Sequence, residues 1–212
     1  MAEKKVLLDR FRKISTGTLA NALDEFGYHA NVLKTIKSVS PGFRLFGEAM
    51  TVKEKVGDFG TFSSEDFAIG QIIDMAEPGN VIAIDEGGAA CSTWGGMATL
   101  AAKQKGIQGI VVDGGVRDLE EIIEIDFPVF ARYLVPSTGR SRLKVESINT
   151  TIVVDGVHVE PGDIIVGDGT GIVSIPAKHM YDIFSLAESF SKDDARAEID
   201  IQNGLSFTEA MA

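Results

Sequence analysis

The first quarter of the chain has apolar residues at helical spacing and then at strand spacing. Residues 15–27 place apolar side chains three and four apart behind hydroxyl-bearing caps and end at Gly27, which predicts a helix. Residues 47–56 alternate between apolar and polar positions, which is typical of a strand. Residues 63–79 have a helical pattern that begins with a serine pair and ends at Pro78-Gly79, so we expect a second helix there.

The middle of the chain alternates between short apolar runs and helical segments. Strands are expected at 81–85, 107–113 and 127–134, and helices at 96–106 and 117–125. Such alternation predicts parallel strands joined by crossover helices. The strand that contains Val111 and Val112 is expected to stop at Asp113, because charged Arg117 and Asp118 cannot both lie in a core and two glycines can turn the chain before them.

The last third of the chain changes character twice. Residues 150–176 contain successive strands with no helix between them, and Asp155-Gly156 between two valine-rich runs predicts a hairpin. Residues 177–202 return to a helical pattern. We therefore expect one mixed α/β domain over 1–212 that has an extra β layer, with 177–212 as a C-terminal helical extension. No break in composition marks a second domain.

Composition and charge restrict the kind of partner. The chain has 212 residues, of which 44% are apolar, and its net charge is −11. A surface of this charge repels nucleic acids and anionic membranes, so neither is an expected partner. The one cysteine, Cys91, cannot form an internal disulfide, the charged first residues contain no apolar signal region, and no apolar run could span a bilayer. These features predict a cytoplasmic protein.

A glycine pair precedes the helix expected at 96–106. Gly95 and Gly96 would leave the backbone N–H groups of Gly96, Met97 and Ala98 unpaired at the start of that helix, and such groups bind anions. The same glycines could equally form a tight turn between a strand and a helix, with no ligand. Both interpretations stay open on this segment alone.

A second group of polar residues follows the next strand. Arg117 offers a planar guanidinium that suits a carboxylate, and Asp118 offers oxygen ligands to Mg²⁺ or Mn²⁺. Glu121 follows Asp118 by three residues and therefore shares its face of a helix. These residues could instead form a surface salt-bridge cluster. Because the carboxyl ends of neighbouring parallel strands meet at one sheet edge, we expect this group to lie beside the glycine pair and form a ligand site.

Other residues with possible chemistry are weaker candidates. Cys91 lies among small residues and is expected to be packed, and Asp168 is expected to form a turn. Trp94 could line a pocket or cover the core. The three histidines have no spacing typical of metal ligands: His29, His158 and His179.

The segment WGGMATLAAKQKGIQGIVVDGGVRDLEEIIEIDFPVFAR resembles the RraA-like family. Similar stretches before and after it are TGTLANALDEFG, GEAMTV and PGDIIVGDGTGIVSIP, so that the resemblance covers most of residues 14–176. The family includes class II 4-hydroxy-4-methyl-2-oxoglutarate aldolases, oxaloacetate decarboxylases and the regulator of ribonuclease E activity A. The resemblance implies a three-layer β/β/α swivelling-domain-like fold and a homotrimer or homohexamer.

The resemblance also implies a function and its residues. It implies a lyase that depends on Mg²⁺ or Mn²⁺ and cleaves a carbon–carbon bond next to a 2-keto acid to give pyruvate. Arg117 would hold the carboxylate of this small substrate and Asp118 the metal, with Glu121 close by, while Gly95 and the amides of Gly96, Met97 and Ala98 would bind the pyruvyl oxygens. A neighbouring subunit could add an acidic residue, for which this chain offers three candidates: Asp193, Asp194 and Glu198.

One position departs from the aldolase pattern. The family's aldolases have an aspartate twenty-one positions before the arginine, where this chain has Gly96. The regulators usually keep less of the arginine–aspartate site, which is intact here. The alternative to a lyase is a non-catalytic regulator that binds an RNA-processing enzyme, and the intact Arg117-Asp118 pair argues against it.

Overall fold

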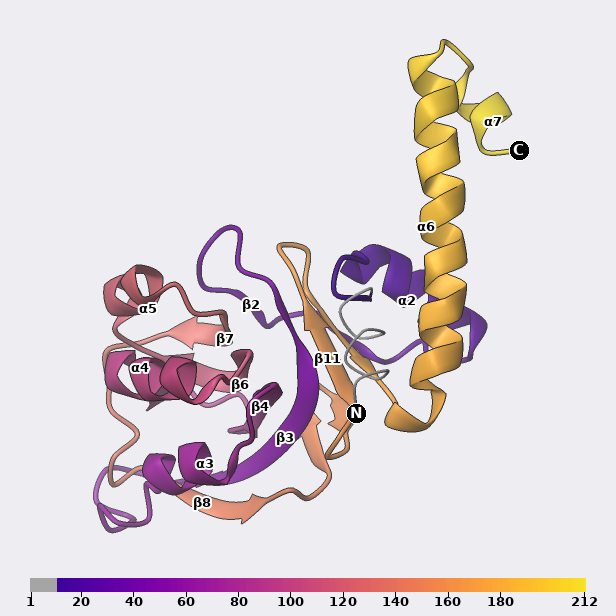
Figure 1. Cartoon of the computed structure of the whole chain (residues 1–212). Helices are drawn as coiled ribbons and strands as arrows, with labels where there is room; N and C mark the ends of the chain where they lie inside the picture. The colour runs from indigo at the N-terminus through magenta and orange to yellow at the C-terminus, as the bar shows by residue number, and fades with distance from the viewer. Residues whose placement is uncertain (1–10) are drawn as a thin grey trace.

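The computed structural model describes residues 11–212 and has a large mixed sheet at its centre (Figure 1). The main strands lie in the following order: β1 (Val32–Leu33), β12 (Ile172–Ile175), β11 (Ile164–Gly167), β3 (Leu45–Val56), β4 (Asn80–Asp85), β6 (Gly109–Val116), β7 (Val129–Leu134) and β2 (Lys37–Ser38). Two further strands extend it, since β5 (Ser92–Trp94) pairs with β6 and β8 (Leu143–Ile148) pairs with β3. The mixed α/β fold class expected from the sequence is confirmed.

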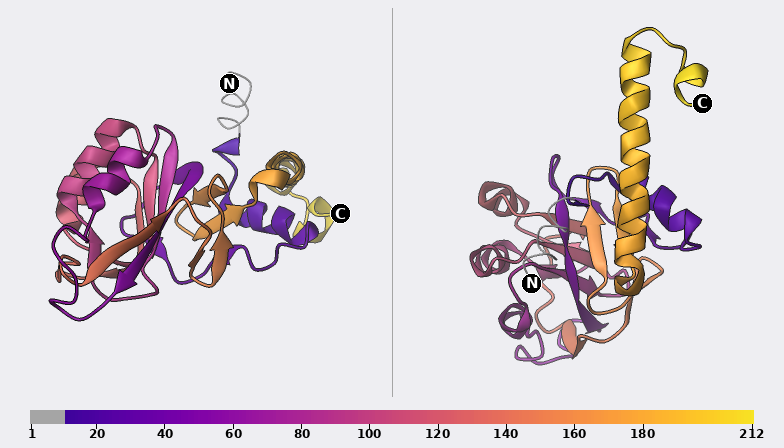
Figure 2. Two further views of the ribbon diagram at one scale, coloured as in Figure 1. Left: turned by 90° about the horizontal axis from the view of Figure 1, so that it is seen from below. Right: turned by 45° about the vertical axis from the view of Figure 1, so that its right-hand side comes forward.

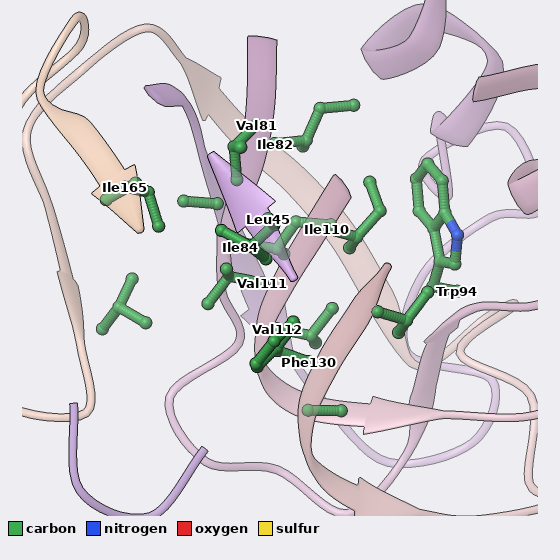
Figure 3. Packing of buried hydrophobic residues seen from close by; sticks show 14 of the residues in the cluster. Leu45, Val81, Ile82, Ile84, Trp94, Ile110, Val111, Val112, Phe130 and Ile165 are labelled. Atoms are coloured by element: carbon green, nitrogen blue, oxygen red, sulfur yellow. The ribbon is translucent and has the colours of Figure 1, made fainter. Parts of the chain in front are cut away.

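Strands β3, β4, β6 and β7 are parallel, as the alternating pattern predicted. The helices that connect them cover one face of the sheet in Figure 1: α3 (Ile69–Met75), α4 (Gly96–Lys105) and α5 (Leu119–Ile125). Figure 3 shows the apolar core that the strands form, with Ile82, Ile84 and Val112 fully buried and the indole of Trp94 beside them. The connecting helices place the glycine pair and the arginine–aspartate pair at neighbouring strand ends.

The segment 150–176 forms strands, as expected, but they divide between two sheets. A separate hairpin consists of β9 (Ile152–Val154) and β10 (Val157–Val159), and its turn has the positive φ values of 52° at Asp155 and 80° at Gly156. Strands β11 and β12 instead join the main sheet as antiparallel neighbours. The hairpin is fixed to the sheet because the Val153 amide donates to Asp85 at the end of β4 and the Asp155 amide donates to Asp113 within β6.

The two terminal helical regions pack together against β11 and β12. Helix α2 (Thr16–Glu25) and helix α6 (Met180–Gln202) share a second apolar cluster that includes Leu19, Leu23 and Phe184. Asp168 forms the expected turn and also accepts hydrogen bonds from the amide and hydroxyl of Thr16, which fixes the start of α2. After the short helix η1 (Ala177–His179), α6 projects away from the sheet and is followed by α7 (Phe207–Ala210), as Figure 2 shows.

The expected end of β6 at Asp113 is wrong, because the strand continues to Val116. A side chain on Gly114 would overlap the Glu86 carboxyl group, and one on Gly115 would overlap the backbone of Cys91. The two glycines therefore do not turn the chain; they let neighbouring segments approach a strand that continues.

Other elements also differ from the expectation. The helix expected from residue 63 begins only at Ile69, because Ser63 and Asp66 exchange hydrogen bonds in a turn that does not continue as a helix. Strands β1, β2, β5 and β8 were not predicted. Within residues 11–212, no helix is both long enough and apolar enough to cross a membrane.

Candidate active site

The glycine pair lies where β5 passes into α4. Gly95 is extended, with φ −157°, and Gly96 is the first residue of the helix. A Cβ on Gly95 would lie 2.5 Å from Oδ2 of Asp118, and a Cβ on Gly96 would overlap the carboxylate of Glu121. Two carboxylates from the start of α5 thus occupy the space that side chains at 95 and 96 would need.

Asp118 turns its carboxylate toward the start of α4. Its backbone has the left-handed φ of 60°, which is uncommon for a residue other than glycine and which aspartate tolerates better than most. Its Oδ2 accepts a hydrogen bond of 3.1 Å from the Gly96 amide and lies 3.4 Å from Nε of Arg117. The expectation that the Gly96 amide is unpaired is therefore wrong, because it donates to Asp118; Met97 and Ala98 occupy the rest of the first turn.

The backbone of Arg117 is fixed by a hydrogen bond, whereas its guanidinium is partly exposed to solvent. Its amide donates to the Trp94 carbonyl oxygen over 3.0 Å, which joins the end of β6 to the end of β5. Its side chain is 44% exposed. The guanidinium can therefore reach a bound anion without breaking a buried ion pair.

Two cavities adjoin Arg117 and Asp118. The smaller, of about 200 Å³, lies against β5 and the start of α4, and its walls include Thr93, Gly95, Met97, Ala98, Phe67 and Thr138. The larger, of about 390 Å³, lies on the side of Leu119, Glu120 and the end of β7. Each could hold a small dicarboxylate, since both have Arg117 in their wall.

The structure thus brings the predicted glycine pair and the predicted group around Arg117 and Asp118 together. Gly95, Gly96, Arg117, Asp118 and Glu121 meet at the start of α4. The sequence interpretation did not identify Phe67, Thr93 and Thr138 as cavity residues. No motif marks them, because each comes from a different segment that only the fold brings to this edge.

Two buried carboxyl groups lie near β5. Glu86 is fully buried; its Oε2 accepts from the Gly115 amide and its Oε1 from the thiol of Cys91. Burial raises the pKa of Glu86 to about 9 and the pKa of Cys91 to about 12. Cys91 is packed, as expected. Burial also raises the pKa of Glu54 to about 7, although its hydrogen bond with Thr93 opposes the rise.

Other sequence candidates lie as follows. Trp94 is both buried and part of the cavity wall, and its indole N–H donates to the Thr99 hydroxyl over 3.0 Å. The acidic candidates Asp193, Asp194 and Glu198 lie on α6, which projects on the other side of the molecule from α4 and α5 (Figure 1). A single chain therefore does not bring them to this site.

The carboxylates of Asp118 and Glu121 fit a hard divalent cation. Within residues 11–212, no group of three or more His, Cys, Asp or Glu side chains is arranged to hold a metal. Mg²⁺ needs fewer protein ligands than that, because it keeps several waters and binds one or two carboxylates together with its substrate. Asp118 in the wall of the open cavity and Glu121 over Gly96 meet this requirement.

Comparison with known proteins identifies the family. Residues 16–174 match the model of the RraA-like family, described as Aldolase/RraA. This chain belongs to the RraA-like family. The resemblance noted in the sequence is therefore confirmed.

Individual relatives cover nearly the whole chain. It is 34% identical to an uncharacterized protein of Methanocaldococcus jannaschii, with 98% of each chain covered. It is 32% identical to a provisionally named 4-hydroxy-4-methyl-2-oxoglutarate aldolase of Halalkalibacterium halodurans, with 90% of this chain and 86% of the relative covered. Its fold is similar to RraAS2 of Streptomyces coelicolor, a member of the RNase ES inhibitor RraA family, with a TM-score of 0.77, 25% identity, and 94% and 96% of the two chains covered.

Proposed function

We propose that this protein is a divalent-metal-dependent lyase that cleaves a carbon–carbon bond next to a 2-keto acid and releases pyruvate. The observation that carries the proposal is the convergence of Arg117 and two carboxylates on the first turn of α4. The substrates that fit are oxaloacetate, by decarboxylation, and 4-hydroxy-4-methyl-2-oxoglutarate, by retro-aldol cleavage. The name of the H. halodurans relative supports the same reaction class.

In this proposal the chain's own groups bind and orient the substrate. Arg117 holds the substrate carboxylate with its planar guanidinium, and the amides of Met97 and Ala98 face the oxygen on which negative charge develops. Asp118 and Glu121 would hold Mg²⁺ or Mn²⁺, which supplies Lewis acidity to the keto group when bound. Such pre-organised donors each contribute on the order of 10²–10³ in rate.

The test is pyruvate release by Asp118→Asn with and without added Mg²⁺. Asparagine tolerates the left-handed backbone of residue 118 and can still accept from the Gly96 amide, so the fold should be kept. The substitution removes the negative charge that holds the cation. We expect kcat/KM for oxaloacetate to fall by about 10²-fold or more while the melting temperature stays the same.

Glu124→Gln is the matched control, because Glu124 is an exposed carboxylate on the same helix, α5, and lines neither of the two cavities. Its activity should equal that of the natural protein. A folded Asp118→Asn protein with full Mg²⁺-dependent turnover would remove Asp118 from the proposed role.

A second candidate is a regulator that binds an RNA-processing enzyme without catalysis. Two observations favour it: the similarity to RraAS2, and a net charge of −11 that suits a basic protein surface. Turnover separates the candidates. A regulator predicts no pyruvate from either substrate with Mg²⁺ or Mn²⁺, whereas the lyase predicts metal-dependent release that chelation abolishes.

A further inference from the structure

A buried carboxyl group lies directly behind the wall of the smaller cavity. Glu54, near the end of β3, is only 2% exposed. Its Oε1 accepts a hydrogen bond of 2.9 Å from the hydroxyl of Thr93, and its Oε2 is buried with no hydrogen-bond partner within residues 11–212. Thr93 itself forms part of the cavity wall beside Gly95 and Arg117. One hydroxyl group therefore connects a buried acid to the proposed site.

The ionisable groups around Glu54 leave it without a charged partner. Glu86 and Cys91 are hydrogen-bonded to each other, and Arg142 lies over the ring of Phe59 and donates to the Thr138 carbonyl. The lysines of β3 and β8 pair with carboxylates elsewhere, as Lys53–Asp85, Lys55–Glu146 and Lys144–Asp66. An isolated acid of this kind is costly to bury in the charged form, and a structural role alone would be met by an uncharged side chain.

We propose that Glu54 takes up and returns the proton that moves at carbon 3 of the pyruvyl group, through the hydroxyl of Thr93. In this assignment Thr93 is the group that touches the substrate, and Glu54 is a positioning residue that acts through it. The inference deepens the proposed lyase function and rests on it. It adds a proton pathway that uses neither Arg117 nor Asp118.

The proton transfer balances in the cleavage direction. The electron pair of the broken carbon–carbon bond becomes the enolate of pyruvate. The Thr93 hydroxyl proton then moves to carbon 3, and the Glu54 proton moves to Oγ of Thr93, which leaves Glu54 as a carboxylate. Glu54 regains its proton from water through Thr93 after the product leaves. Because the pKa of Glu54 is raised to about 7, both of its forms are populated near neutral pH.

The test is the exchange of pyruvate methyl protons with D₂O, followed by NMR in the presence of Mg²⁺. This reaction contains only the proton transfer and needs no bond cleavage. In this direction the Glu54 carboxylate must accept the proton, so the exchange rate should rise as the pH passes through about 7. Glu54→Gln keeps the size and the acceptor for Thr93 but cannot hold the proton. We expect it to lose that rise and to exchange at least about tenfold more slowly.

A second pair of variants tests the connecting hydroxyl. Thr93→Val keeps the shape without the hydroxyl and should lose exchange, whereas Thr93→Ser keeps the hydroxyl and should restore it. Glu25→Gln, at an exposed position on α2, is the control and should behave as the natural protein. If Glu54→Gln fails to fold, the comparison of Thr93→Val with Thr93→Ser decides the question.

The outcomes separate this inference from the proposed function. Natural exchange rates and an unchanged pH profile in folded Glu54→Gln would overturn the relay. A natural protein that exchanges pyruvate protons but cleaves neither substrate would overturn the lyase function, and the variants would still decide the relay. A natural protein without any exchange would overturn the relay as well.

Discussion

Two carboxylates from the start of α5 occupy the space that side chains at positions 95 and 96 would need, so only glycine fits at these positions. Asp118 lies where a side chain on Gly95 would begin, and Glu121 lies where one on Gly96 would begin. The family's aldolases have an aspartate at the position of Gly96. We propose that Glu121 supplies the carboxylate that position 96 lacks, from the first turn of α5.

If Glu121 supplies the carboxylate that position 96 lacks, the behaviour of three variants follows. Glu121→Ala should weaken Mn²⁺ binding by about 10–100-fold, because one of two carboxylates near the cation is lost. Adding Gly96→Asp to Glu121→Ala should restore binding, because the vacated space then accepts the new side chain. Gly96→Asp alone should gain little, since the added aspartate and Glu121 would compete for one place. Calorimetric titration with Mn²⁺ measures each case.

Activity with the two substrates gives a second measurement on the same variants. Retro-aldol cleavage must remove a proton from a hydroxyl group, whereas decarboxylation does not, so an aspartate at position 96 should favour the aldol substrate relative to oxaloacetate. Glu124→Ala, at an exposed position on the same helix, is the control for the loss of a nearby charge. Unchanged Mn²⁺ affinity in Glu121→Ala would show that Glu121 is not the substitute.

At the scale of elements, the end of β4 and the extended β6 are joined through the buried carboxyl of Glu86. This group is protonated in the folded chain up to about pH 9, whereas its pKa in an unfolded chain is near the model-compound value of 4.5. The folded state therefore binds more protons between these two values. Stability should fall as the pH rises through this window, because folding then requires a proton that the unfolded chain has released.

Glu86→Gln should remove this dependence. The amide can accept from the Gly115 amide with its oxygen and donate to Cys91 with its nitrogen, so both contacts can be kept. We expect the variant to melt higher than the natural protein at pH 8 and to show a flatter dependence of Tm on pH between about 5 and 9. Glu25→Gln, on the exposed side of α2, should leave the curve unchanged. If Glu86→Gln showed the same dependence of Tm on pH as the natural protein, the assignment of Glu86 as a buried acid would be wrong.

The elements also show what the sequence could predict. The sequence identified β3 by its alternating pattern, β4 as a short apolar run that is buried along almost its whole length, and α4 by the glycines that bound it. It failed at Gly114 and Gly115, where glycine allows close packing and not a turn. Glu54 was not identified from the sequence either. Its side chain is buried in β3, although a glutamate at this place in the sequence is expected to be a surface charge. Burial of a charged residue depends on which segments pack over it, and spacing within its own strand does not contain that information.

At the scale of the whole molecule, the site and the C-terminal helix lie on different sides of the sheet. Helices α4 and α5 cover one side, while α2 and α6 form a separate cluster at the other (Figures 1 and 2). The alternation of strands and helices predicted the fold class. It also predicted that the glycine pair meets Arg117 and Asp118, since these two groups follow the ends of neighbouring parallel strands. The projection of α6 away from the sheet could not be predicted in this way, because the apolar pattern of a helix does not show how far the helix extends beyond the core against which it packs.

The distal half of α6 predicts self-association. The side chains that α6 packs against α2 and the sheet lie within its first three turns, from Met180 to Phe190. Beyond them, apolar side chains are exposed on α6 and on the segment that follows, including Ile199, which is 59% exposed, and Phe207, which is 71% exposed. Exposed apolar groups of this size on a projecting helix are typical of a surface that is covered by another subunit.

We propose that a second copy of the chain covers this surface, in a trimer or a pair of trimers. Light scattering should then give a mass of three or six times the 22.7 kDa chain. A variant that ends at Ser191 keeps the cluster around Phe184 and should stay folded, but its mass should fall toward that of one chain. Ile199→Glu should act in the same direction, because a charge would replace an apolar contact at the interface, whereas Asp200→Glu at the next position should not. A full-length chain that is monomeric at micromolar concentration, or a shortened chain that remains a trimer, would rule out this helix as the site of assembly.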